Sequence, residues 1–187
     1  KVLNILVKKM AESVKQPLSY NKLKNTVVST GCSITVPTTI DYVGYASDSW
    51  LILPIENELS KLAEKESQKK YYFVDNGLLN LFLINPETSL LENLVAVHLC
   101  REYGRENVSY YKADREIDFV VSDAQLAIQV SYSIKGDDTF ERETTPLFHF
   151  MKNHEGWRSL IITYDEKDTI EKDGERIEVV PIWKWLL

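Results

Sequence analysis

One carboxylate in this chain lies in a run of residues that otherwise favours a buried strand. Asp118 is set between Ile117 and Phe119 in the run EIDFVV, and a second apolar run, LAIQV, follows after a short turn. The second run carries Gln129, with Ser131 two positions later. Because strand side chains alternate between faces, Gln129 and Ser131 share one face. The pattern predicts two neighbouring strands that present a carboxylate and an i, i+2 polar pair.

The chemistry open to these residues is that of a weak metal site. Clustered carboxylates hold Mg²⁺, which prefers oxygen ligands. A metal-dependent nuclease also needs a group that activates water or stabilises charge on the phosphate, commonly lysine or the metal itself. Gln129 offers an uncharged carbonyl oxygen, and Ser131 has neither the charge nor the reach of a lysine. We therefore expect no tight Mg²⁺ binding; alternatively, Asp118 only caps a strand end or pairs with Arg115.

Several motifs along the chain resemble, in order and spacing, those of one protein group. They are SLLENLVAVHL (89–99), EIDFVV (116–121), IQVSYSI (128–134), TFERETTPL (139–147), LIITYDE (160–166) and VVPIWKWLL (179–187). Together they resemble the C-terminal domain of bacterial and archaeal AAA-type ATPases, over roughly residues 75–187. Residues 1–74 look like the winged-helix-like region that precedes that domain. The resemblance implies two domains, 1–74 and 75–187.

This resemblance implies a restriction-endonuclease-like α/β fold, that of the PD-(D/E)xK nucleases, with a mixed sheet and flanking helices. Carried over by position, Glu92 is the helix acid, Asp118 the strand acid, and Gln129 and Ser131 occupy the ExK positions. The last two depart from the catalytic pattern, so Glu92 and Asp118 are left as a possible weak metal site. Arg142 or Lys135 would have to replace the missing lysine. Glu92 has a simpler alternative role, as an acid at a helix N-terminus.

The function implied is a cytoplasmic partner- or substrate-binding module with a degenerate nuclease site, so this fragment is expected not to be catalytic. The same resemblance implies an upstream ATPase module in the same chain and an unidentified protein partner. No GxxxxGK[ST] motif occurs in these residues, so ATP is expected only in that upstream module and no cofactor in this fragment. Two alternatives remain open: a nuclease using Glu92, Asp118 and Gln129, and a winged-helix DNA-binding regulator.

Composition places the chain among soluble folded proteins. It has 187 residues, 44% hydrophobic and 27% charged, and no apolar window near the ~18 residues needed to cross a bilayer. No membrane partner or signal peptide is expected, and the lack of an initiating Met suggests a fragment of a longer chain. Cys32 and Cys100 are expected as buried free thiols in a reducing compartment. The three histidines show no zinc-type spacing.

The first 74 residues follow the plan of a winged helix. Apolar spacing predicts a helix from residue 2 to about 15, a second over 20–29 capped by Ser19, and a third from Pro37 to Ala46. Two strand-like runs follow, at 50–55 and 71–74, with a charged connection between them. Three helices and a two-stranded ribbon are therefore expected.

The remaining residues alternate between helices and strands. A helix is predicted at 90–101, the two strands of the polar pair follow it, and a second helix is predicted at 139–152, where Pro146 should start or kink a segment. Strands are expected at 160–164 and 177–182, with a charged turn at 165–176 that contains Asp173-Gly174. Residues 183–187 form a hydrophobic tail. This order predicts an α/β domain with a mixed sheet.

Charge limits what nucleic acid the chain could hold. Residues 1–74 carry 10 Lys against 7 Asp and Glu, a net +3, whereas residues 75–187 carry 12 Lys and Arg against 21 Asp and Glu, a net −9. The third predicted helix, the recognition candidate, has no Lys or Arg. Contacts to DNA would fall to Lys22, Lys24, Thr38 and Thr39, with Lys69 and Lys70 able to reach phosphates. We expect weak, non-specific and salt-dependent binding.

Overall fold

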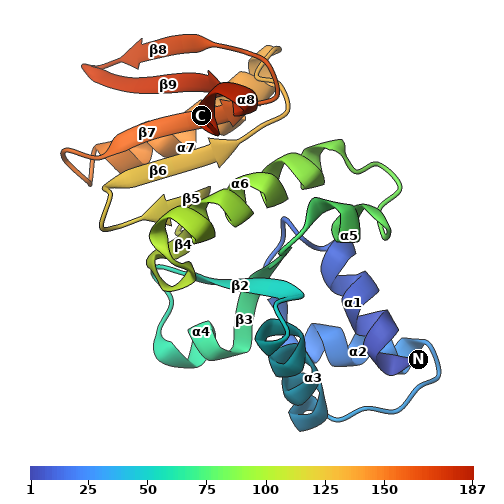
Figure 1. Ribbon diagram of the computed structural model, residues 1–187. Coiled ribbons are helices and arrows are strands. Elements are labelled where there is room, and N and C mark those ends of the chain that lie inside the picture. The colour runs from blue at the N-terminus through green and yellow to red at the C-terminus, as the bar shows by residue number, and fades with distance from the viewer. The chain divides into compact units, whose positions relative to one another are not determined.

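The computed structural model describes residues 1–187, which divide into two compact units (Figure 1). The first comprises Lys1–Glu56 with Ser60–Val97, and the second Asn57–Leu59 with His98–Leu187. The division falls within helix α6 (Glu87–Tyr103), which contributes residues to both units. Residues 75–97, grouped by the sequence with the C-terminal domain, belong by contact to the first unit.

Three helices open the first unit, as predicted: α1 (Val2–Glu12), α2 (Tyr20–Ser29) and α3 (Val36–Asp48). The hydroxyl of Ser19 accepts a hydrogen bond from the backbone N–H of Lys22 and caps α2, as expected. Thr35 caps α3 in the same way, and Pro37 lies in its first turn. The buried residues of α1 recur at helical spacing, which is why the apolar pattern located it.

A small antiparallel sheet completes the first unit, in the order β1 (Leu18–Ser19), β3 (Gln68–Phe73) and β2 (Ile52–Asn57). Strands β2 and β3 form the expected ribbon, with Leu53 opposite Tyr72. Helix α4 (Leu62–Ser67) fills the charged connection between them, and α5 (Asn76–Asn80) follows β3. No residue of α4 is buried. Its sequence therefore has no regular spacing of apolar residues from which the helix could have been predicted. Winged-helix membership stays a prediction.

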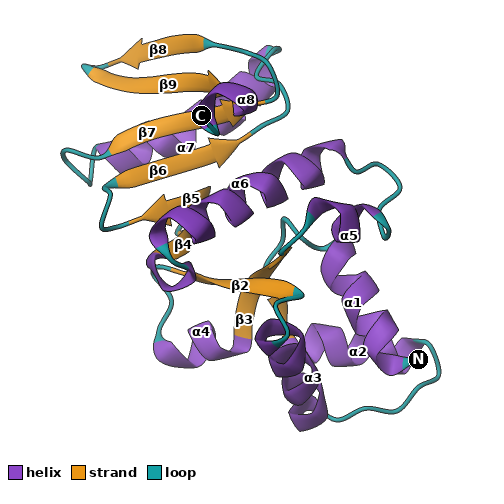
Figure 2. Ribbon diagram, viewed as in Figure 1, coloured by secondary structure: helices purple, strands orange, loops and turns teal.

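The second unit holds a mixed sheet, as predicted, in the order β4-β5-β6-β7-β9-β8 (Figure 2). Strands β6, β7 and β9 are parallel, and the other neighbouring pairs are antiparallel. A single turn of 3-10 helix, η1 (Arg105–Asn107), precedes the sheet. The strands are β4 (Val108–Lys112), β5 (Glu116–Val121), β6 (Leu126–Val130), β7 (Arg158–Thr163), β8 (Asp168–Lys172) and β9 (Glu175–Pro181).

Helix α7 (Asp137–Met151) packs on this sheet, and α8 (Ile182–Trp185) follows β9. The core between α7 and the strands is apolar, with Leu147, Phe150 and Met151 from the helix against Val120, Ala127, Ile161, Ile177 and Val179. Pro146 lies inside one continuous helix and does not start a segment; the kink that was the other expectation stays a prediction. Its buried neighbours on α7 hold the helix against the sheet, which offsets the backbone hydrogen bond that proline lacks.

Strand β8 corrects the expectation that residues 165–176 form only a turn. It pairs with β9, with Ile170 opposite Ile177, and the two-residue turn between them is Asp173-Gly174. Both turn residues have positive φ, 55° and 87°, as a tight hairpin of this kind requires. The turn was thus located correctly, and the strand before it was missed. None of the helices is both long and apolar enough to span a membrane.

Candidate functional site at the β5–β6 junction

Asp118 and Gln129 lie opposite one another where the pairing of β5 and β6 ends. The last regular pair is Phe119 with Ile128, so Asp118 and Gln129 come next along the two strands. Beyond the last regular pair, hydrogen bonds from side chains take the place of the backbone hydrogen bonds between the two strands. Gln129 Oε1 accepts from the backbone N of Asp118 at 2.8 Å, and Asp118 Oδ2 accepts from the backbone N of Val130 at 2.9 Å. The predicted strand acid and first ExK position are therefore in contact.

Helix α7 adds a second carboxylate. Gln129 Nε2 donates to Glu143 Oε2 at 3.0 Å. The other oxygen of Glu143 accepts from Arg142 Nε at 3.0 Å and from Arg142 Nη2 at 2.8 Å. Glu143 is 6% exposed, whereas the Arg142 side chain is 68% exposed. A chain of hydrogen bonds thus runs from the backbone of Asp118 through Gln129 and Glu143 to a guanidinium at the surface.

The environment of Glu143 opposes its ionisation. Burial raises the pKa of the Glu143 carboxyl above its ordinary value, and the negative charge of Asp118 adds to this rise. The hydrogen bonds and charge of Arg142 and the amide of Gln129 oppose the rise without cancelling it. Asp118 on β5 and Glu143 on α7 are therefore close enough to interact electrostatically.

Ser131 and Lys135 make their hydrogen bonds and ion pair outside this hydrogen-bond chain. Ser131 is buried, and its hydroxyl donates to the carbonyl oxygen of Ser133 at 2.8 Å. Lys135, one of the two candidates for the missing lysine, is 83% exposed and pairs with Glu166 at 3.5 Å. Arg142, the other candidate, does reach an acid of the site, but that acid is Glu143.

Glu166 joins the loops that follow β6 and β7. It accepts from the Ser133 hydroxyl at 2.6 Å and from the Ile134 backbone N at 2.9 Å. Burial alone would raise the pKa of this carboxyl. The hydrogen bonds from Ser133 and Ile134 and the charge of Lys135 outweigh that effect and lower its pKa.

Glu92 makes its described contacts within the first unit. It is 3% exposed, accepts a hydrogen bond from the Tyr72 hydroxyl at 2.8 Å, and lies 3.8 Å from Nζ of the fully buried Lys70. Helix α6 begins at Glu87, so Glu92 is not in its first turn, and the helix-terminus alternative is wrong. Convergence of Glu92 with Asp118 and Gln129 stays a prediction.

The nucleic-acid candidates need two corrections. Thr39 has 0% exposure, and its hydroxyl donates to the carbonyl oxygen of Thr35, so it cannot reach DNA. Lys70 likewise has no exposed surface. Lys22 is exposed, Lys24 is half-buried, and the half-buried Thr38 shares a hydroxyl hydrogen bond with Thr35 at 2.9 Å.

The residue that sequence reasoning missed at the site is Glu143. It lies inside the quoted run TFERETTPL, four residues before Leu147, and so falls on the apolar face of α7. A carboxylate on the buried face of a helix was the available signal. Cys32 and Cys100 are free thiols, but they are half-buried rather than buried as expected.

The donor set fits a divalent metal poorly. Two carboxylates and one amide come together, and the chain contains no group of three His, Cys, Asp or Glu side chains that could hold a metal ion. The oxygens of Gln129 and Glu143 already accept hydrogen bonds from protein donors. Mg²⁺ gives up its water reluctantly and needs more negative charge than this. The arrangement is suited to joining β5, β6 and α7.

Comparison with known proteins gives two matches. Residues 1–88 match a family described as a domain of unknown function (DUF8612). The chain is also 33% identical over 196 residues to an uncharacterized protein of Methanocaldococcus jannaschii, MJ1544. That alignment covers 98% of this chain and 43% of the archaeal protein, so the chain spans less than half the length of this relative. The matches support a domain of unknown function, and any activity must be argued from the site.

Proposed function

We propose that this chain is the C-terminal, non-ATPase region of an AAA-type ATPase, where it serves as a partner- or substrate-binding module. In this proposal the second unit has the fold of a PD-(D/E)xK nuclease without its activity. The upstream ATPase module and a protein partner are the expected binding partners. Nucleotide hydrolysis belongs to the upstream module and not to this chain.

The observation that carries the proposal is the use of the site's polar groups for internal hydrogen bonds. The side-chain oxygen of Gln129 accepts a hydrogen bond from the backbone N–H of Asp118, and its amide nitrogen donates one to Glu143. Asp118 in turn accepts from the backbone of Val130. Catalysis requires groups aimed at the reacting atoms, whereas these groups are aimed at the protein itself. Such a network supports the sheet and leaves these groups bonded to the protein rather than directed at a substrate.

The length of the archaeal relative is compatible with an additional module. More than half of that protein lies outside the matched region. We expect nucleotide binding to reside there. Purifying the relative and measuring its ATP hydrolysis, with and without the matched region, tests this part of the proposal. Absence of nucleotide binding in the remainder would remove the ATPase context.

A cleavage assay tests the inactive site. The chain is incubated with single- and double-stranded DNA in Mg²⁺ or Mn²⁺, beside the variant Asp118→Asn and the matched control Asp123→Asn, an exposed residue. The wild type should cleave no faster than Asp118→Asn. Metal-dependent cleavage that Asp118→Asn abolishes and Asp123→Asn retains would overturn the proposal.

A metal-dependent nuclease is the second candidate, and one observation favours it. Asp118 raises the pKa of Glu143, so two carboxylates lie close enough to interact. A divalent cation could relieve this repulsion if Arg142 moved away from Glu143. Titration calorimetry with Mg²⁺ and Mn²⁺ separates the two candidates. Micromolar binding, lost in both Asp118→Asn and Glu143→Gln, would favour the nuclease.

A further inference from the structure

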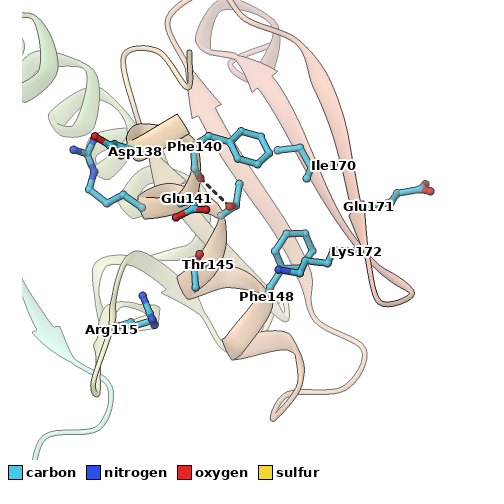
Figure 3. Close-up of a pocket in the computed structure, with 11 residues that line it drawn as sticks. Arg115, Asp138, Phe140, Glu141, Thr145, Phe148, Ile170, Glu171 and Lys172 are labelled. Atoms are coloured by element: carbon cyan, nitrogen blue, oxygen red, sulfur yellow. Dashed lines mark hydrogen bonds between the residues drawn. The ribbon is translucent and has the colours of Figure 1, made fainter. Parts of the chain in front are cut away.

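The second unit contains a pocket that adjoins the β5–β6 site through Arg142 (Figure 3). Its volume is about 810 Å³, and it lies between one face of α7, strand β8 and the turn that joins β4 to β5. Helix α7 supplies Phe140, Glu141, Thr145 and Phe148, and the turn supplies Arg115. Neither Asp118 nor Gln129 lines this space, but Arg142, which is hydrogen-bonded to Glu143 of the β5–β6 site, does.

Three basic side chains line this pocket. Arg142 of α7 is paired with Glu143, and the other two face the pocket from opposite sides. Arg115 projects from the β4–β5 turn and Lys172 from β8, with Thr145 between them in the view of Figure 3. The Lys172 ammonium lies 6.0 Å from the centre of the Phe148 ring, a cation–π contact. Neither of these two groups forms an ion pair, although both are exposed. They leave positive charge available to a ligand.

Negative and apolar groups occupy other parts of the lining. Glu141 and Asp138 belong to α7, both exposed and without an ion pair, whereas Glu171 points away from the pocket (Figure 3). The ring of Phe140, which is 37% exposed, faces Ile170 across the gap between α7 and β8. The pocket therefore offers an acidic part, a basic part and an apolar wall.

We propose that this pocket binds a short peptide segment that carries a basic group, an apolar side chain and a carboxylate in succession. The basic group of the peptide would lie toward Glu141 and Asp138, and its carboxylate toward Arg115 and Lys172. The apolar side chain would pack on Phe140 and Ile170. A purely anionic or purely cationic ligand would meet repulsion from one part of the lining, which a dipolar peptide avoids.

This inference rests on the proposed function in one respect, that the partner is a protein. It names the chemistry of the segment recognised and gives Asp118, Gln129 and Glu143 no contact with that segment. The peptide titration described next and the cleavage assay described above use different ligands and different variants. A failure of one is therefore distinguishable from a failure of the other.

Three matched peptides test the proposal by NMR titration of the whole chain. The first, the dipeptide lysyl-phenylalanine, carries both the basic groups and the carboxylate. The second, lysyl-phenylalanine amide, lacks the carboxylate. The third, N-acetyl-phenylalanine, lacks the basic groups. The dipeptide should bind with roughly fivefold higher affinity than either control. Acetyl-lysyl-phenylalanyl-aspartyl-amide then tells whether the carboxylate comes from a chain terminus or a side chain. Tighter binding by either the dipeptide or this capped peptide supports the proposal.

Two variants place the binding at this pocket. Lys172→Gln and Arg115→Gln remove exposed charges and should leave the fold intact, while each weakens dipeptide binding roughly fivefold. The control Lys167→Gln, an exposed residue of the loop before β8, should bind like the wild type. The proposal is overturned if neither doubly charged peptide binds more tightly than the controls. Equal binding by Lys172→Gln, Arg115→Gln and the wild type overturns it too.

Discussion

Asp118 and Gln129 each hydrogen-bond to the backbone of the opposing strand. The carbonyl of the Gln129 side chain accepts from Asp118 N, and the Asp118 carboxylate accepts from Val130 N, at 2.8 and 2.9 Å. These two bonds continue the connection of β5 to β6 beyond the last regular pair, Phe119 with Ile128. Side chains at the expected metal-ligand positions therefore also hold the sheet together.

Replacing Gln129 should destabilise the second unit. Gln129→Leu keeps a similar volume but leaves the N–H of Asp118 and one oxygen of Glu143 without their partner. An unsatisfied buried polar group costs roughly 1–3 kcal/mol, so urea denaturation should show a loss of at least that size. Gln68→Leu, the same change at an exposed position, is the control and should alter stability by about 0.5 kcal/mol or less. Equal stability of the two variants would contradict the structural role of Gln129.

Glu143 should make the stability of the protein depend on pH. Burial raises the folded-state pKa of Glu143 above its value in the unfolded chain. Its contribution to stability is therefore complete below the unfolded pKa and declines as pH rises through the folded pKa. The stability of Glu143→Gln relative to wild type should increase over the same window. Urea denaturation from about pH 4 to pH 8 measures this, with the exposed Glu141→Gln as control. A difference that is constant or falls with pH would contradict it.

Glu166 should act in the opposite direction. Its folded-state pKa is lowered, because the bonds from Ser133 and Ile134 and the charge of Lys135 outweigh burial. Its contribution is present above the unfolded pKa, about 4.3, and is lost as pH falls through the folded pKa. Glu166→Gln should cost roughly 1–3 kcal/mol near neutral pH and less in acid. The exposed neighbour Asp165→Asn serves as control, and a cost that persists at low pH would contradict the charge-based explanation.

Cys100 should react slowly in the folded protein. Burial raises the pKa of its thiol to about 12, the charge of Arg105 opposing this rise and that of Glu106 adding to it. The thiolate is the reactive form, so little of it exists near pH 8. Iodoacetamide labelling followed by mass spectrometry should modify Cys100 far more slowly in the native protein than in denaturant. Similar rates in both states would show that the thiol is accessible and ionised.

The sequence predicted the elements that have a clear apolar period or cap. Helix α2 spans the expected residues because Ser19 caps it and apolar side chains recur along it. Strand β8 was missed because four of its five residues are polar and only Ile170 turns inward. Strand β4 was missed as well. Its buried residues Val108 and Tyr110 alternate with more exposed ones, which is the pattern of a strand. Strand β8 lies at the edge of the sheet and is mostly exposed, so its apolar pattern is weak.

The site was predictable only along the two strands. The alternation of β5 and β6 brought Asp118 and Gln129 together correctly, because register fixes which residues face each other. Glu143 comes from α7, the element that follows β6. Its place on the buried face of the helix could be read from the sequence, but its contact with Gln129 depends on how α7 packs on the sheet. The comparison with the nuclease motif also ended at the ExK positions, Gln129 and Ser131. It therefore did not consider Glu143, the carboxylate that Arg142 binds.

DNA binding by residues 1–74 should be weak and strongly dependent on salt. Helix α3 exposes Ile40, Asp41 and Tyr45 but no basic side chain, and Thr39 is buried. Only phosphate contacts from residues such as Lys22 are available, and these carry no sequence information. Fluorescence anisotropy with labelled duplexes, at about 50 to 200 mM salt, should show affinity falling steeply for every sequence alike.

One substitution distinguishes phosphate contact from sequence reading. Lys22→Gln should reduce the salt slope by about 1 and weaken all duplexes equally, because it removes one phosphate contact. Thr38→Val should have no effect, since its hydroxyl is already bonded to Thr35. Nanomolar affinity for one duplex near 150 mM salt, lost in Thr38→Val, would instead identify α3 as a recognition helix. The winged-helix regulator would then replace the partner-binding module as the function of the first unit.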